Sequence, residues 1–349
     1  MNVAMLTATA ERLPLPDTLT RFGISTLVER TRRGLVGAPK GSNSAFAEEM
    51  RSLPIAMSVD EANAQHYEVP ARFFELVLGP QRKYSCCFYR DASSSLGDAE
   101  EDALEITALR AGLSDGQQIL ELGCGWGSLS LWMARAFPNA RIVSVSNSHS
   151  QRQHIEQRAA ALGLSNLDVV TADMNSFETD RRFDRVVSVE MFEHMANWRA
   201  LLGRAKRWLN PGGRLFVHVF AHREMPYRFD HNDPADWIGK YFFTGGLMPS
   251  RALMYEFPDL FEVEADWWWS GTHYARTAQD WLANLDRNRE AVQQLFTGVY
   301  GSDTALWIRR WRLFFLATAG LFGHAGGSEW GVVHYLLKPA DQAVGVSER

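Results

Sequence analysis

The stretch Glu121-Leu-Gly-Cys-Gly-Trp-Gly127 decides the fold class of this chain. It directly follows the apolar run 118–122 and directly precedes the helical pattern 128–137. A strand, a glycine turn and a helix in this order let backbone amides approach a nucleotide-like cofactor. The third glycine comes two residues after the second, whereas a dinucleotide fingerprint places it three residues after. The turn therefore predicts a cofactor site that is not built for a dinucleotide.

Short apolar segments alternate with helical patterns around this turn. Pro138 and Gly163 follow two of the helices, and a Pro-Gly-Gly turn at 211–213 precedes the fifth strand. This alternation predicts an α/β fold with a mostly parallel seven-stranded sheet, helices on both faces, and ligands at the carboxyl ends of the strands. The predicted strands span 118–122, 141–145, 167–171, 185–189, 214–220 and 331–337, with another at Trp267-Trp268-Trp269, and the helices span 128–137, 150–162 and 198–209.

Both ends of the chain add parts to this sheet. We predict an N-terminal helical cap and substrate-site segment over residues 1–100, followed by a cofactor-binding domain over residues 101–349. An aromatic-rich segment at about 221–300 interrupts the alternation after the fifth strand, so we expect it to cover the site as a lid. Within the cap we predict an amphipathic helix at Thr18 to Arg33, a linker at 37–44 and a helical pattern at Glu61 to Leu78.

The composition excludes several classes of protein. A net charge of -5 gives no general electrostatic reason to bind nucleic acid or an anionic membrane. The cysteines Cys86, Cys87 and Cys124 form no disulfide framework, which predicts a reducing, cytoplasmic compartment. The N-terminus lacks a secretory signal pattern. The longest apolar stretch, Leu313 to Phe322, is shorter than the about 20 residues that span a bilayer, so no transmembrane segment is expected.

The spacing E-x-G-x-G-x-G at a strand end resembles the first motif of the S-adenosylmethionine-dependent methyltransferases. Gly123 and Gly125 would leave room for the methionine and ribose parts of that cofactor. Glu121 is placed to orient the turn or to meet the amino group of the cofactor. The resemblance therefore implies S-adenosylmethionine as cofactor and S-adenosylhomocysteine as product.

The second and third strands end in further candidate contacts. Asp173 follows the third strand, where an acid can accept the adenine amino group, and Met174 can pack against the adenine ring. The second strand ends without an acid, so Ser146 or Asn147 would have to bind the ribose hydroxyls. We predict no metal, because His218 and His222 straddle a strand end and lack a third ligand.

A cluster at the end of the fourth strand carries the catalytic prediction. If the chain turns helical from Met191 on, Glu190, Glu193 and His194 lie on one helix face and point toward the cofactor. An amine must be neutral to act as a nucleophile, so a base that removes its proton raises the reactive fraction. The cluster is therefore our candidate for the acid–base group.

Motifs spread over nearly the whole chain resemble the cyclopropane-fatty-acid synthase superfamily of methyltransferases. Within it, the chain looks most like the coclaurine N-methyltransferase branch, because Glu190 stands where the synthases typically have glycine. Synthases that hold a bicarbonate base have Glu and His around a D-W pair, where this chain has Ala265 and Trp268. The motifs are QHYEVP, KYSCC, ELGCGWGS, SVEMFEHM, YFFTGG-x-MPS, HYARTAQDW and EW-x-x-x-H.

The resemblance implies a class I methyltransferase, Rossmann-like fold and roles for individual residues. Glu193 and His194 match an acid–base pair, Glu190 matches an additional site carboxylate, and Tyr67 with Glu68 matches a contact with the substrate amine. The cofactor site predicted from the motifs and the resemblance comprises Tyr84, Ser85, Glu121, Gly123, Cys124, Gly125, Ser146, Asn147, Gln151, Asp173 and Met174.

Three hypotheses of function follow. The first is an enzyme that methylates a secondary or tertiary amine of tetrahydroisoquinoline type, with Glu and His assisting deprotonation. The second is an enzyme that methylates or cyclopropanates unsaturated acyl chains, since the superfamily includes such enzymes. The third is a cofactor-binding protein without catalysis, which the complete acid–base cluster argues against. The expected partner is a small amine, or a lipid acyl chain under the second hypothesis, and a homodimer is possible.

Overall fold

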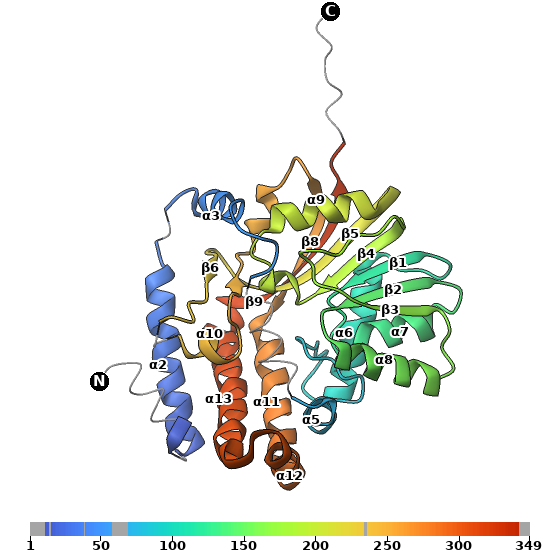
Figure 1. Ribbon diagram of the computed structural model, residues 1–349. Helices are drawn as coiled ribbons and strands as arrows, with labels where there is room; N and C mark the ends of the chain where they lie inside the picture. Colours follow the sequence, from blue (N-terminus) through green and yellow to red (C-terminus); the bar gives the residue numbers. More distant parts are fainter. Residues whose placement is uncertain (1–10, 14, 38, 58–68, 234–235, 342–349) are drawn as a thin grey trace, which may run out of the picture.

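The computed structural model describes residues 11–13, 15–37, 39–57, 69–233 and 236–341. Its centre is a seven-stranded sheet in the order β3-β2-β1-β4-β5-β9-β8 (Figure 1). Strands β1 to β5 run parallel, whereas β9 runs antiparallel to both β5 and β8. The mostly parallel sheet predicted from the sequence is confirmed. The strands span Gln118–Leu122 (β1), Arg141–Ser146 (β2), Leu167–Thr171 (β3), Phe183–Val189 (β4), Leu209–His222 (β5), Phe261–Ser270 (β8) and Trp330–Pro339 (β9), with Tyr227–Arg228 (β6) and Leu247–Met248 (β7) as a separate pair.

Helices cover both faces of this sheet, as Figure 1 shows. On one face, Leu120 of β1 belongs to the same core as Trp198 and Trp208. On the other face, Ile119 of β1 packs in a core with Leu129, because successive side chains of a strand point to opposite sides. A strand buried on both faces must be apolar along most of its length. The helices of this part span Leu96–Ala111 (α6), Ser128–Ala136 (α7), His149–Ala161 (α8) and Trp198–Trp208 (α9).

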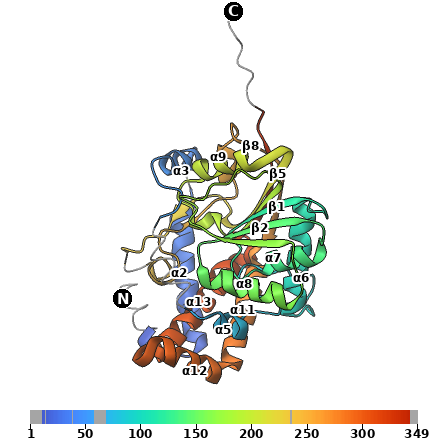
Figure 2. The ribbon, with the colours of Figure 1, turned by 45° about the vertical axis from the view of Figure 1, so that its right-hand side comes forward.

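A second layer, made of helices, lies below the sheet in both ribbon views (Figures 1 and 2). Phe73, Trp281, Trp311 and Phe315 are almost completely buried in the core of this layer. Aromatic rings remove a large apolar area from water, which explains much of the tryptophan content of the C-terminal half. The layer and its surroundings contain Asp17–Leu35 (α2), Ser42–Met50 (α3), Ala71–Val77 (α5), Trp237–Tyr241 (α10), Gly271–Arg287 (α11), Arg289–Tyr300 (α12) and Thr304–Gly323 (α13), with 3-10 helices at Phe192–His194 (η1), Leu253–Glu256 (η2), Gly301–Asp303 (η3) and His324–Gly327 (η4).

The segment after β5 differs from a simple lid. Strand β8, which carries Trp267 to Trp269, is the edge strand of the main sheet rather than part of a cover. Its partner β9 lies about sixty residues later in the chain, and such antiparallel pairing leaves no trace in the alternation of strands and helices. The helical layer continues through α13, beyond the predicted end of the insertion at about residue 300.

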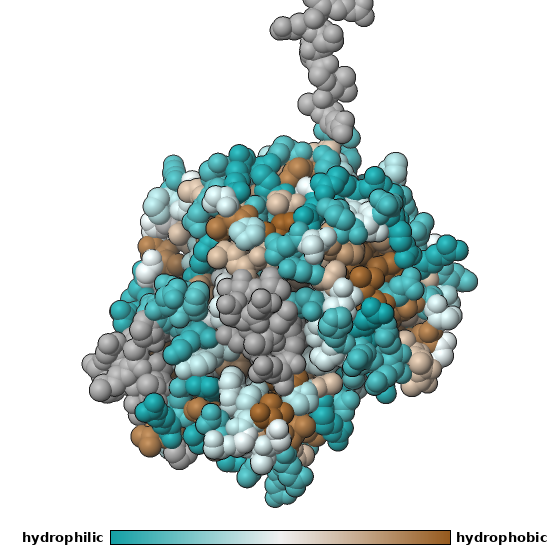
Figure 3. Space-filling view, in the orientation of Figure 1, coloured by the Kyte–Doolittle hydropathy of each residue, from teal (hydrophilic) through white to brown (hydrophobic). Residues whose placement is uncertain are grey.

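The N-terminal part agrees with the sequence in its helix and differs in its linker. The helix predicted at Thr18 to Arg33 is confirmed as α2, whereas α3 already begins at Ser42 inside the predicted linker 37–44. Among the described residues, no helix is both long enough and apolar enough to cross a membrane. Hydrophilic side chains cover most of the face drawn in Figure 3.

Candidate active site

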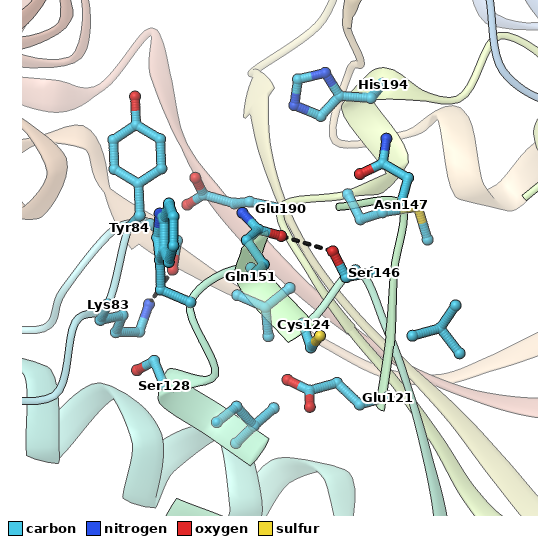
Figure 4. Close-up of a pocket in the computed structure, with 18 of the residues that line it drawn as sticks. Lys83, Tyr84, Glu121, Cys124, Ser128, Ser146, Asn147, Gln151, Glu190 and His194 are labelled. Atoms are coloured by element: carbon cyan, nitrogen blue, oxygen red, sulfur yellow. Dashed lines mark hydrogen bonds between the residues drawn. The ribbon is translucent and has the colours of Figure 1, made fainter. Parts of the chain in front are cut away.

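A pocket opens where the carboxyl ends of the parallel strands meet the helical layer (Figure 4). Its other wall comes from Tyr274 and Trp281 of α11 and from Phe314 of α13. Figure 4 shows Lys83 and Tyr84 on one side of the pocket and Asn147 and His194 on the other. All residues of the predicted cofactor site line it: Tyr84, Ser85, Glu121, Gly123, Cys124, Gly125, Ser146, Asn147, Gln151, Asp173 and Met174. Their individual contacts with a cofactor stay a prediction.

The glycine turn gives the pocket its floor and accepts no side chain at its first position. Gly123 has φ +78°, and a Cβ there would lie 2.6 Å from the side chain of Met191. At Gly125 an added Cβ would meet nothing within 4 Å, so this position opens onto free space. The adjacent hydroxyl of Ser128 is buried without a hydrogen-bond partner among the described residues. Free space beside an unused hydroxyl fits the predicted S-adenosylmethionine.

Glu121 orients this turn from below. Its carboxylate is buried and accepts hydrogen bonds from Ser130 on α7 and from Ser144 on β2, the latter at 2.7 Å. Burial raises the pKa of Glu121, and the two serine hydroxyls oppose that increase. Of the two roles predicted for Glu121, the hydrogen bonds support orientation of the turn.

The second strand ends in a polar turn in which one serine is already engaged. Ser146 donates to the side chain of Gln151 at 2.7 Å and accepts from the amide of Ser148 at 3.0 Å. Asn147 lines the pocket beside it. Asp173, in turn, accepts from the amide of Asn175 at 2.8 Å. Of the two residues predicted to bind ribose, Asn147 is the better placed.

The segment from Gly79 to Cys87 brings the N-terminal part of the chain to the pocket. The Glu100 carboxylate on α6 accepts hydrogen bonds from the backbone amides of Gly79, Gln81 and Lys83, at 3.0, 2.7 and 3.2 Å. Thr277 on α11 accepts from the amide of Cys87 at 3.1 Å. The segment that carries Tyr84 and Ser85 is thus held by two helices.

Glu190 occupies the centre of the candidate catalytic cluster. Its backbone has φ +47°, in the left-handed region, directly after β4. Oε1 accepts from the amide of Cys86 at 2.8 Å and lies 3.2 Å from Nε2 of His218, while Oε2 accepts from the Tyr274 hydroxyl at 2.6 Å. Burial raises the pKa of Glu190, whereas the charge of Lys83 and the bonds from Tyr274 and Cys86 lower it.

Glu190 and His194 both line the pocket, whereas Glu193 does not join them there, contrary to the prediction. The helical turn begins only at Phe192, because the left-handed residue Glu190 reverses the chain first. Glu193 is fully buried behind the pocket and accepts from the amide of Phe220 at 2.7 Å, whereas His194 lines the pocket with its ring 4.4 Å from that of Phe243. Burial, together with the charge of Glu190, holds the pKa of Glu193 well above its usual value.

Several residues of the site escaped the sequence prediction. Lys83 is the first residue of the KYSCC motif, but lysine side chains are normally solvent-exposed, so the motif alone did not mark it as a site residue. Tyr274 lies in the HYARTAQDW motif, and only its contact with Glu190 reveals its role. His218 was considered only as a metal ligand, whereas it faces Glu190 instead. Within the described residues, no group of three or more His, Cys, Asp or Glu side chains could hold a metal ion.

Two other sets of predicted residues do not contribute to the described pocket. Ala265 and Trp268 lie on β8 and neither lines the pocket, so they do not separate the branches of the superfamily through contact with the site. The predicted amine contact at Tyr67 and Glu68 lies outside the described residues.

We expect Glu100→Gln to destabilise the protein by about 1–3 kcal/mol, because its amide group would face backbone donors that the carboxylate now satisfies. Denaturant unfolding of both proteins at neutral pH should show this difference in the free energy of unfolding. Glu105→Gln, on the exposed side of α6, is the control; an equal effect of both substitutions would contradict the assignment.

Comparisons with known proteins agree with this geometry. The family described as mycolic acid cyclopropane synthetase matches residues 57–325. The (S)-coclaurine N-methyltransferase of Thalictrum flavum subsp. glaucum is 36% identical and covers 84% of this chain and 82% of that protein. The cyclopropane-fatty-acyl-phospholipid synthase of Escherichia coli (strain K12) is 28% identical and covers 72% of this chain and 66% of that protein.

Among solved structures, coclaurine N-methyltransferase bound to N-methylheliamine and SAH superposes with a TM-score of 0.89. It is 32% identical, and the match covers 96% of this chain and 99% of that chain. The fold predicted from the sequence is thereby confirmed over almost its entire length. The chain belongs to the mycolic acid cyclopropane synthetase family and is an S-adenosylmethionine-dependent methyltransferase.

Proposed function

We propose that this enzyme methylates the nitrogen of a secondary or tertiary amine of tetrahydroisoquinoline type. The observation that carries the proposal is the Glu190 carboxylate, whose side chain is 8% exposed and which lines the same pocket as His194. A carboxylate favours a positively charged amine, and an imidazole can accept its proton. The names of the similar N-methyltransferases support the same substrate class.

Aromatic side chains form much of the remaining pocket wall. Phe220 and Phe243 lie on the side of His194, and Tyr274, Trp281 and Phe314 come from the helical layer. Aromatic faces attract cations and pack against flat ring systems. This lining suits an amine attached to an aromatic ring system, which would carry charge at one end and an apolar body at the other.

The residues around the pocket divide the work of the reaction. When bound, S-adenosylmethionine supplies an electrophilic methyl group on a sulfonium. His194 lines the pocket and takes the proton from the amine nitrogen, which frees its electron pair. Glu190 stabilises the positive charge that accumulates on the nitrogen. Glu193 assists from outside the pocket lining, where burial favours the protonated form of its carboxyl.

Lipid modification is the second candidate function, because the family includes a cyclopropane-fatty-acyl-phospholipid synthase among its relatives. The aromatic wall would also accept an acyl chain. An alkene, however, has no proton that must be removed before methylation, so this function gives the pocket-facing His194 no early task. The predictions of a homodimer and of a cytoplasmic location stay predictions.

Turnover of methyl-labelled S-adenosylmethionine against a panel of cyclic amines and phospholipids tests the proposal directly. We expect label in N-methylated amines, with secondary and tertiary ring amines preferred because the pocket combines a carboxylate with aromatic walls. Label that appears only in acyl chains would favour the second candidate. Label in neither class would remove both.

Replacement of the acid–base pair should cripple turnover without abolishing it. We expect His194→Ala with Glu193→Gln to lower kcat by roughly 10²- to 10⁴-fold, since a positioned base contributes that much. Binding of S-adenosylhomocysteine should stay within a few fold, because Glu193 lies outside the pocket lining and His194 is not part of the predicted cofactor site. The exposed His231→Ala is the control. Full activity in the double variant would show that the roles are wrongly assigned.

Gly123→Ala should weaken cofactor binding, because its left-handed backbone costs a side chain about 1–2 kcal/mol and the new Cβ would displace Met191. We expect the Kd for S-adenosylhomocysteine to rise about tenfold or more by calorimetry. Gly163→Ala has a similar φ of +69° but meets nothing within 4 Å and lies outside the pocket lining. Its Kd should therefore remain unchanged, and equal losses in both variants would mean that backbone strain alone is measured.

A further inference from the structure

Lys83 is an unusual residue for its place in the fold. Among the described residues it is the only lysine or arginine that is buried, with 3% of its surface exposed. Burial of an ammonium costs several kcal/mol unless hydrogen bonds and an opposite charge compensate it. A lysine in such a place therefore needs a partner that accounts for its charge.

Hydrogen bonds of Lys83 connect it to the segment that contacts Glu190. Its Nζ donates to the Ser85 hydroxyl and to the Cys86 carbonyl, both at 2.6 Å. The amide of the same Cys86 donates to Oε1 of Glu190 at 2.8 Å. Lys83 thus stabilises the local conformation of residues 83–86 in which the Cys86 amide donates to Glu190.

The charge of Lys83 acts on Glu190 as well. The side chain of Glu190 is only 8% exposed, and Lys83 is the first of the groups that oppose the effect of burial on its ionisation. The other groups that face Glu190 are the Tyr274 hydroxyl of α11 and the His218 imidazole of β5, and the Glu193 carboxyl of η1 lies close enough to interact with its charge. Burial holds the pKa of His218 well below its usual range, so Lys83 is the cation in this group.

We propose that Lys83 is a positioning residue for methyl transfer: its buried ammonium fixes the Cys86 amide on Glu190 and keeps that carboxylate ionised. Lys83 does not itself touch the reacting atoms in this role. Glu190 can then offer a full negative charge to a cationic substrate inside an apolar pocket. The ionisation of Glu190 does not depend on the proposed function. Only the role of the Glu190 charge in methyl transfer rests on it.

Infrared spectroscopy can test the ionisation of Glu190 without any substrate. In wild type, the protonated-acid carbonyl band should show no difference between the protein and its Glu190→Gln variant at neutral pH, because Glu190 is ionised. In the Lys83→Met background, Glu190 should be protonated and give a protonated-acid carbonyl band. That band should be missing from the Lys83→Met, Glu190→Gln double variant. Absence of that band in the Lys83→Met background would overturn the proposal, whatever substrate the enzyme uses.

Kinetics test the consequence for the reaction, once an amine substrate is in hand. Lys83→Met should move the acidic limb of kcat to higher pH, since Glu190 then ionises only at higher pH. Below the limb, turnover should fall about tenfold for every pH unit by which the limb moves. KM for S-adenosylmethionine should change little. A raised KM with an unchanged pH profile would mean that Lys83 binds the cofactor instead, which also overturns the proposal.

Two further variants keep the test decisive. Lys206→Met is the control. Lys206 lies on α9, donates to the Ala340 carbonyl at 2.7 Å and does not line the pocket. The infrared spectrum and pH profile of this variant should therefore equal those of wild type. If Lys83→Met does not fold, Lys83→Gln retains a donor for the Cys86 carbonyl but lacks the charge. It should show the same protonated band and the same displacement of the acidic limb. If no amine is turned over by wild type, the proposed function fails while the infrared result still decides the role of Lys83.

Discussion

A buried carboxylate has to receive hydrogen bonds, and this requirement at Glu190 joins the main parts of the molecule. Its donors are the Cys86 amide from the N-terminal segment, the Tyr274 hydroxyl from the helical layer and the neighbouring His218 from the sheet. An unsatisfied carboxylate at this depth would cost several kcal/mol. The three parts therefore hold one relative position, and the pocket that they enclose is formed before any substrate binds.

Two other buried carboxylates, Glu100 and Glu121, also receive several hydrogen bonds near the pocket. Glu100 receives three backbone amides of the segment that carries Lys83, and Glu121 receives two hydroxyls beneath the glycine turn. Glu100 thereby stabilises an irregular stretch of backbone, and Glu121 connects β1 to α7, the two elements that flank the glycine turn, and to β2. The regular sheet positions the ends of its strands, and buried carboxylates shape the turns between them.

The sequence predicted what depends on periodicity and on local motifs. The strand at 118–122 and the turn at Gly123 follow from neighbours in the chain, and the structure reproduces both. The pairing of β8 with β9 and the effect of the Lys83 charge on Glu190 depend on residues brought together by folding. The placement of Glu193 on the pocket-facing side with Glu190 and His194 was wrong, because the left-handed φ of Glu190 is not encoded in helical spacing.

The two glutamates of the cluster differ in charge because their surroundings differ. Burial raises the pKa of both, and two like charges this close cannot both form without a large cost. At Glu190 the charge of Lys83 and the Tyr274 and Cys86 donors oppose burial, whereas Glu193 has backbone amides and an Oε2 without a partner among the described residues. These surroundings therefore favour the proton on Glu193 over Glu190. Two carboxylates separated in this way allow one to attract a cation while the other remains neutral, and His194, which faces the pocket, is left as the base.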